Sequence, residues 1–318
     1  MSRRCVDRTS FRKTLFGGLG VFLVPALLSV SWAENRVGGA FLKMDIGARS
    51  SAMGSAFTAV ADDADSVRWN PAGLARSCRQ LSAMHSEGTA DLSYDLLGFI
   101  LPTSRGAIGV TAIALSQGDL ERRDQSGRRD GSFDADDRAL IVSLGQPLSP
   151  SVSVGLSGKY IVQQIDDVNA VGTAVDAGLQ IHSPDSAVSW GLAVRNVGSD
   201  MRYLREEYHL PLNGSLGFGY QLLRSLTLTG DVSYEPYAHK TSAGLGTEYW
   251  AFQRVALRAG YLTSAARGKG SLEGSSLAEV PGVSFGVGLR LFGSQFDYAV
   301  QSESEWGPVH RLSFSFRF

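Results

Sequence analysis

The strict alternation of apolar and polar side chains is the feature that most constrains the fold of this chain. It is clearest in the last nine residues, 310–318, which read "HRLSFSFRF". Successive side chains of a strand point to opposite faces, so this segment has one apolar and one polar face. A chain end in water usually frays, and an exposed aromatic residue gains nothing there. The pattern therefore predicts a strand whose apolar face contacts something other than water.

The same period of two recurs along most of the chain. Examples are "VSWGLAVR" at 188–195, "SLGFGYQL" at 215–222 and "VSFGVGLRLF" at 283–292, each with glycine and serine on the polar parity. Helical spacing does not account for these segments. The pattern predicts fourteen strands, at approximately 79–86, 93–101, 106–117, 138–146, 151–164, 172–183, 187–196, 212–222, 225–234, 240–250, 254–263, 282–292, 295–302 and 309–318.

The connections between these segments alternate in length. Short turns such as "PTSR", "LR" and "GS" follow even-numbered strands, while long polar segments follow the third, seventh and eleventh strands. Short turns at one end and long loops at the other are typical of an outer-membrane barrel, whose closure pairs every backbone group. We therefore predict an all-β fold, a 14-stranded antiparallel transmembrane β-barrel. Its aliphatic and aromatic parity, including Leu289, should contact lipid, and its Gly/Ser/Arg parity, including Gly288, should line the lumen.

The N-terminus has the features of an export signal. A basic opening is followed by the apolar run "LFGGLGVFLVPALLSV" and by small residues at Ser31 and Ala33. This order predicts a signal peptide over 1–33, and hence export to the bacterial outer membrane, with the barrel over 79–318. Removal of the leader would take away Cys5 and leave Cys78 without an intrachain disulfide partner.

Residues 34–78 do not alternate and are rich in alanine, serine and glycine. Asn70 followed by Pro71 predicts the N-cap and first position of a short helix. A fourteen-stranded barrel lies between barrels filled by side chains and open porins, so it has room for a plug. We expect this partly helical segment to be a hatch inside the lumen. A flexible periplasmic leader is the alternative.

The segment "GARSSAMGSAFTAVADDADSVRWNPAGLA" resembles the N-terminal block of the PorV/PorQ family, within the FadL-type group of barrels. "GLAVRNVG" followed by "LPLNGSLGFGY" is also similar to that family. The resemblance implies a fourteen-stranded barrel with a hatch that contains an Asn-Pro-Ala motif. Here that motif corresponds to Asn70, Pro71 and Ala72, followed by Gly73. The alternating aromatic end, with Phe314, Phe316 and Phe318, resembles the signal that barrel-insertion machinery recognises.

Motifs for an enzyme or a metal site are missing from the sequence. It contains no G-x-S-x-G, H-E-x-x-H or G-x-x-x-x-G-K pattern, and its five histidines are scattered. With 30 Lys+Arg against 31 Asp+Glu there is no concentrated basic face for nucleic acid. We therefore expect neither catalytic nor metal-binding residues, and no cofactor.

Two functions fit a plugged outer-membrane barrel of this kind. The resemblance favours a PorV-like component that handles exported cargo or surface attachment, as in type IX secretion, with the outer loops as its binding surface. The alternative is FadL-like uptake of hydrophobic small molecules, which predicts an apolar pocket between hatch and wall. The expected partners are outer-membrane lipid, the barrel-insertion machinery, and either exported proteins or hydrophobic molecules.

Overall fold

The computed structural model describes residues 37–88, 92–124, 126–183, 187–265, 282–303 and 307–318. Fourteen antiparallel strands close into one barrel, in the order β1-β16-β15-β14-β13-β12-β11-β10-β7-β6-β5-β4-β3-β2. This confirms the predicted fold class. The barrel strands are β1 (Gln80–Glu87), β2 (Leu92–Pro102), β3 (Ala107–Arg123), β4 (Arg129–Pro147), β5 (Val152–Ile165), β6 (Val168–His182), β7 (Val188–Gly198), β10 (Asn213–Leu223), β11 (Leu226–Glu235), β12 (Lys240–Ala251), β13 (Val255–Ala265), β14 (Val283–Leu291), β15 (Ser294–Glu303) and β16 (Gly307–Arg317).

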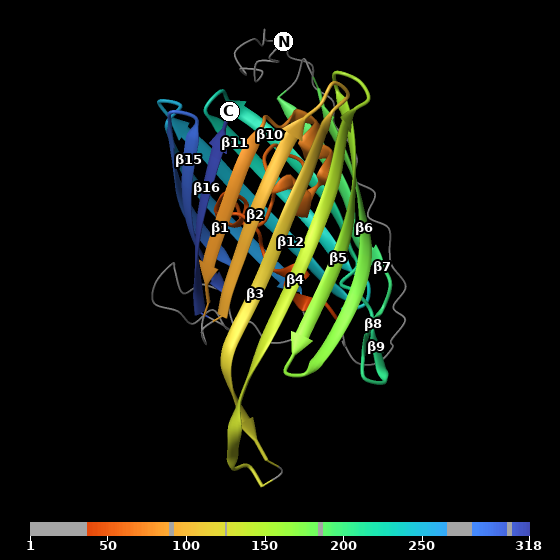
Figure 1. Ribbon diagram of the computed structural model, residues 1–318. Coiled ribbons are helices and arrows are strands. Elements are labelled where there is room, and N and C mark those ends of the chain that lie inside the picture. The colour runs from red at the N-terminus through yellow and green to blue at the C-terminus, as the bar shows by residue number, and fades with distance from the viewer. Residues whose placement is uncertain (1–36, 89–91, 125, 184–186, 266–281, 304–306) are drawn as a thin grey trace.

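The two ends of the barrel differ in their connections (Figure 1). One end carries the short turns, such as residues 224–225, 252–254 and 292–293, together with the C-terminus. We call it the turn end. The opposite, loop end carries the β3–β4 connection and the small hairpin of β8 (Met201–Tyr203) and β9 (Glu206–Tyr208). The long connections predicted after the third and seventh strands thus lie at the loop end, whereas the β5–β6 connection there, 166–167, is as short as the turns. Most of the connection predicted after the eleventh strand lies outside the described residues.

The segment before β1 threads the lumen from the loop end to the turn end. It starts beside the β8–β9 hairpin, where Gly38 N donates to His209 O at 3.0 Å, and it leaves at Arg76 to enter β1. We call residues 38–77 the hatch. Its short helices are η1 (Ala40–Lys43), α1 (Ala48–Ser51), α2 (Ser66–Trp69) and η2 (Pro71–Arg76).

Within the described part of the chain, no helix has the length and apolar character needed to cross a membrane. The proposed signal peptide, 1–33, lies outside the described residues. Cys5 also lies outside the described residues, so the expectation that Cys78 has no intrachain partner once the leader is removed stays a prediction.

Side chains point as the alternation predicted over most of the wall. On β14, Leu289 is 41% exposed on the outer surface, whereas Ser284 is fully buried toward the lumen. Strands β1 to β5 differ in part, because apolar side chains also occur on their inward parity, among polar ones such as Gln80 and Lys159. Met84, Leu96 and Ile161 are buried there against the hatch. Alternation does not reveal these inward apolar positions, because it assigns the inward face to polar residues.

The β3–β4 connection was expected to be a loop from 118 to 137, but β3 and β4 continue into it as a two-stranded ribbon. Leu120 pairs with Phe133, and Glu121 pairs with Ser132. Strand β5 pairs with β4 only from Ala135 onward, so the ribbon projects beyond the barrel rim (Figure 1). Outside a bilayer neither face needs to be apolar, so the ribbon shows no hydrophobic alternation.

Candidate functional site: the hatch and the wall around it

A buried network of charges joins the hatch to three strands. Arg49 in α1 donates to Glu248 on β12 at 2.8 and 3.0 Å, and to Asp62 and Asp63 within the hatch at 2.6 and 2.9 Å. Glu248 also accepts a 2.8 Å hydrogen bond from Arg258 on β13. Arg258 in turn donates to Asp297 on β15 at 2.7 Å.

Buried charges are tolerated when they are paired and hydrogen-bonded in this way, and breaking one such pair is costly. The network therefore holds the hatch near the turn end. Sequence reasoning missed Arg49. The sequence feature that could have indicated Arg49 is its position as a lone arginine among small residues, shortly before the acidic run "DDAD".

The Asn-Pro-Ala-Gly stretch is fully enclosed in the lumen. Asn70 caps η2, because its side-chain oxygen accepts from Ala72 N at 3.1 Å, as the sequence predicted. Its amide nitrogen donates to Thr58 O within the hatch at 2.9 Å and to Leu179 O on β6 at 3.0 Å. Asn70 thus links two parts of the hatch to the wall.

Glycine lets the wall and the hatch approach at this motif. A Cβ at Gly178 on β6 would lie 2.0 Å from the Asn70 side-chain oxygen, and one at Gly73 would lie 2.2 Å from Ala61 O. Both positions require glycine for close packing. Pro71 and Ala72 are buried beside them. That this motif acts as the hatch anchor remains a prediction.

Two further polar groups of the wall contact the hatch. Asp231 on β11 accepts hydrogen bonds from Phe57 N at 3.0 Å and from Thr58 N at 2.8 Å. Arg195 on β7 donates to Arg68 O and Trp69 O, both at 3.3 Å. Both charged side chains lie on the polar, lumen-facing parity of their strands. Both bind the backbone of the hatch.

The other side of the hatch is apolar and packs against β1 to β5. Its contribution comes from Phe41, Leu42, Ile46, Val67 and Leu74. The wall contributes Met84, Tyr94, Leu96, Ile100, Ile113, Ile141 and Ile161. The wall of β1 to β5 therefore contributes an apolar sector of the lumen, in which buried polar side chains such as Ser143, Ser157 and Lys159 also occur.

Little free volume remains between the hatch and the wall near β1 and β16. The cavity there has about 20 Å³ and is lined by Arg49, Asp63, Asp65 and Asp297, among others. That is close to the space one water molecule needs. Burial, together with the carboxylates of Asp63 and Asp297, raises the pKa of Asp65 well above its ordinary value. The predicted apolar pocket between hatch and wall is not found at this place.

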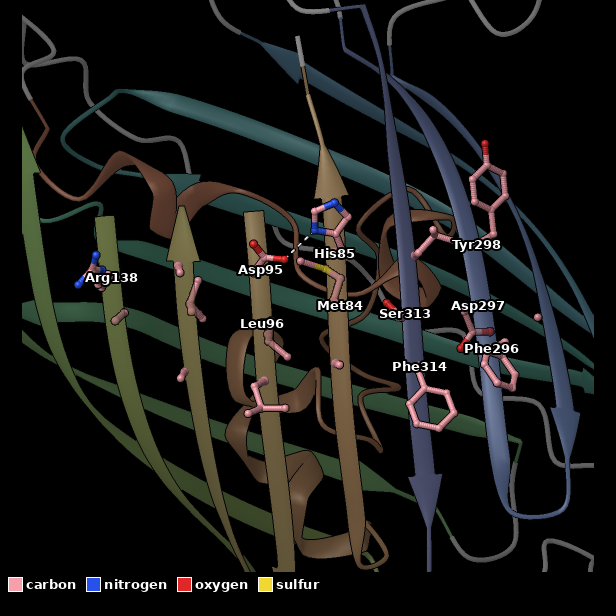
Figure 2. A pocket seen from close by; sticks show the side chains of 18 of the residues that line it. Met84, His85, Asp95, Leu96, Arg138, Phe296, Asp297, Tyr298, Ser313 and Phe314 are labelled. Atoms are coloured by element: carbon pink, nitrogen blue, oxygen red, sulfur yellow. Dashed lines mark hydrogen bonds and ion pairs between the residues drawn. The ribbon is translucent and has the colours of Figure 1, made fainter. Parts of the chain in front are cut away.

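A much larger recess lies on the outer surface of the same wall (Figure 2). It has a volume of about 1150 Å³ and extends over β13 to β16 and β1 to β5. Most of the side chains that reach it belong to the outward parity. They are Ala83, Leu97, Ala112, Ala114, Leu140, Tyr160, Val287, Leu289, Phe296, Tyr298, Leu312 and Phe314. A barrel is normally convex outside, so the wall is bent inward here.

The aromatic residues of the proposed assembly signal all lie on β16 or at its end. Phe314 packs on Phe296 of β15 with ring centroids 4.9 Å apart, and Phe316 stacks on Phe318 at 5.5 Å. Phe316 and Phe318 are exposed on the outer surface. Their role in assembly remains a prediction. In the described ranges, no three His, Cys, Asp or Glu side chains are grouped to hold a metal.

The closed barrel and its threaded hatch define a plugged β-barrel. Similar structures include the monoaromatic hydrocarbon channel CymD, with TM-score 0.64, 14% identity and coverage of 86% of this chain and 97% of that one. The toluene transporter TodX of Pseudomonas putida matches with TM-score 0.61, 13% identity, and 85% and 96% coverage. A FadL homologue of Pseudomonas aeruginosa matches with TM-score 0.57, 12% identity, and 86% and 98% coverage.

At these identities the likeness concerns the fold alone, and it agrees with the FadL-type part of the resemblance. By sequence, residues 33–131 match an uncharacterised protein family, UPF0164. No curated protein matches the chain. The closer resemblance to PorV/PorQ stays a prediction.

Proposed function

We propose that this protein is an outer-membrane channel that admits hydrophobic small molecules when its hatch moves. The observation that carries the proposal is the apolar sector of the lumen. A water-filled pore is polar inside. Here Phe41 and Ile46 of the hatch cover Met84, Leu96 and Ile113 of the wall. Displacing the hatch would uncover these apolar side chains, which suit a hydrophobic molecule.

The orientation of the barrel in the membrane is inferred from the lengths of its connections. Short turns of such barrels lie in the periplasm and long loops outside the cell, so the turn end is periplasmic and the hatch runs inward from the cell surface. A molecule that enters at the loop end first meets η1, which carries the apolar residues Phe41 and Leu42. The polar contacts of Arg49, Asn70 and Asp231 lie deeper. We infer that η1 moves first and that the polar contacts restrain the rest of the hatch.

A disulfide between hatch and wall tests this proposal. A Cβ at Gly98 on β2 would lie 3.7 Å from the Ala64 Cβ in the hatch, within the roughly 3.5–4.5 Å range of disulfides. Cells that produce A64C/G98C should take up radiolabelled toluene or oleate when the protein is reduced. After oxidation, uptake should fall to the level of cells without the barrel.

The two single variants, A64C and G98C, are the matched controls, because they carry the same substitutions without the tether. They should be insensitive to oxidation. Uptake by the double variant that is equal in both redox states would contradict the proposal, provided that electrophoresis shows the disulfide has formed.

A second candidate is a PorV-like role in handling exported proteins, and the β3–β4 ribbon favours it. Residues 118–123 and 129–133 extend beyond the rim as two strands that no further strand of the described chain flanks. Exposed strand edges can add a strand from a partner. Deleting 118–134 should abolish surface attachment of cargo and leave small-molecule uptake unchanged. Loss of uptake alone would exclude this second role for the ribbon.

A further inference from the structure

The outer recess has the shape of a binding site for chain-like apolar ligands. Small side chains, Ala83, Ala112 and Ala114, line it together with large ones such as Tyr160 and Phe296. The volume of about 1150 Å³ exceeds the roughly 300–1000 Å³ of common small-molecule sites. Because the recess faces the lipid phase, acyl chains are the apolar groups that reach it.

Arginines lie along the turn-end rim of the strands that form this recess. Arg254 lies in the β12–β13 turn, Arg79 directly precedes β1, and Arg105 lies in the β2–β3 turn. All three are exposed. The described residues of the turn end contain no acidic side chain, over the segments 76–79, 103–106, 148–151, 224–225, 252–254, 292–293 and 317–318. Even with the carboxylate of the C-terminal Phe318, this part of the rim has a net positive charge.

The opposite edge of the recess has no such excess charge. His85 pairs with Asp95 at 2.7 Å, and Arg138 lies 3.6 Å from Asp136. Each cation there already has an acidic neighbour. An anionic group is therefore attracted to the turn end and not to the loop end.

Aromatic side chains place this rim at the depth of lipid headgroups. Phe252 and Phe292 are 94% and 99% exposed in neighbouring turns, and the Arg79 guanidinium lies 5.7 Å from the ring centre of Phe318. Aromatic girdles mark the membrane interfaces of barrels. Phe314 in the recess is four residues from Phe318, about 13 Å along a strand. Chains that start at this rim therefore reach the recess.

We propose that the recess and the rim arginines Arg79, Arg105 and Arg254 bind anionic diacyl phospholipids of the periplasmic leaflet. The acyl chains lie in the recess, and each phosphate contacts the guanidinium group nearest to it, which suits phosphate geometry. This inference goes beyond the proposed function and is independent of it, because it concerns the outer surface of the wall and not the lumen.

Native mass spectrometry of the full-length protein, released from zwitterionic detergent, tests whether the protein prefers an anionic headgroup. With added phosphatidylglycerol or phosphatidylcholine of identical chains, the phosphatidylglycerol should be retained preferentially. R79Q/R105Q/R254Q should lower its retention to that of phosphatidylcholine. R122Q/R123Q/R128Q, at the loop end, removes the same charge and should leave retention unchanged. Equal retention of the two lipids by the wild type would overturn the proposal.

A second pair of variants tests whether the acyl chains occupy the recess. Ala112→Phe places a large ring in the recess and should reduce phosphatidylglycerol retention. Val175→Phe, which is outward-facing on β6 and outside the recess, should not. If the two variants behave alike, the recess does not hold the chains. If inorganic phosphate displaces phosphatidylglycerol completely, the arginines bind phosphate alone, and the lipid site is overturned.

Discussion

Arg49 in the hatch and Glu248 on β12 lie 199 residues apart in the sequence, and two hydrogen bonds of 2.8 and 3.0 Å join them. The Arg49 side chain is 11% exposed and that of Glu248 is 5% exposed. Water therefore screens this pair little, and each charge depends on the other. This contact connects the plug directly to the barrel wall, and the stability of the closed state depends on it.

Replacing Arg49 should loosen the hatch. Arg49→Met leaves Glu248, Asp62 and Asp63 without their shared cation, and breaking a buried ion pair costs about 3–5 kcal/mol. We expect frequent openings of the purified protein in planar bilayers. Lys43→Met is the matched control in the same segment. Its ion pair with Glu235 spans 3.8 Å with the lysine side chain 39% exposed, so the current should stay at the wild-type level.

Substitutions at Asn70 should separate its two roles. Asn70→Ala removes the cap of η2, worth about 1 kcal/mol, and also the hydrogen bonds to the carbonyls of Thr58 and Leu179, worth about 0.5–1.5 kcal/mol each. Asn70→Ser keeps an uncharged cap acceptor and loses the amide donors. The free energy of unfolding in lipid vesicles should fall in both variants, more in the alanine variant. An equal loss in the serine variant would assign the main role to the donors and not to the cap.

Leu289→Arg places a cation on the lipid-facing surface and should reduce membrane assembly, at about 2–4 kcal/mol near the midplane. Leu289→Phe keeps the site apolar and should assemble normally. The sequence predicted that Gly288→Arg would be better tolerated. The structure argues against that, because a Cβ at Gly288 would lie 2.3 Å from the Asp297 carboxylate. Heat-modifiable mobility on gels measures assembly of all three variants.

The raised pKa of Asp65 predicts how the hatch responds to pH. A raised pKa in the folded state means that the charged carboxylate is disfavoured there, so hatch stability rises as pH falls from this raised pKa toward the ordinary pKa of an aspartate. Asp65→Asn mimics the protonated form and should increase the free energy of unfolding at a pH above the raised pKa. It should also lack the acid-dependent gain of the wild type. Asp62→Asn should have the opposite sign, because it removes an ion pair of Arg49.

Removal of Phe318 tests the proposed assembly signal. The ring stacks on Phe316 and lies at the strand end that closes against β1. We expect slower insertion into the outer membrane with the fold of the inserted protein unchanged. Pulse-labelled cells followed by unheated gels give the rate. Replacement by tyrosine is the control, and an insertion rate for the deletion equal to that of wild type would exclude a role for the last residue.

The sequence alone determined the number of strands, their facing, the sorting of the connections and the Asn70 cap. Each depends on local periodicity or on neighbours a few residues apart, and lipid on one side of a wall imposes that periodicity directly. The ends of β3 and β4 were predicted wrongly, because a ribbon in water needs no apolar face.

Only the tertiary structure decided which groups meet inside and outside the wall. The Arg49–Glu248 contact, the apolar sector over β1 to β5 and the recess each combine strands that are far apart in the sequence. Alternation assigns a side chain to a face but carries no information about its partner. The partner depends on how the hatch threads the closed barrel and on where the wall bends, and both are properties of the packed chain as a whole.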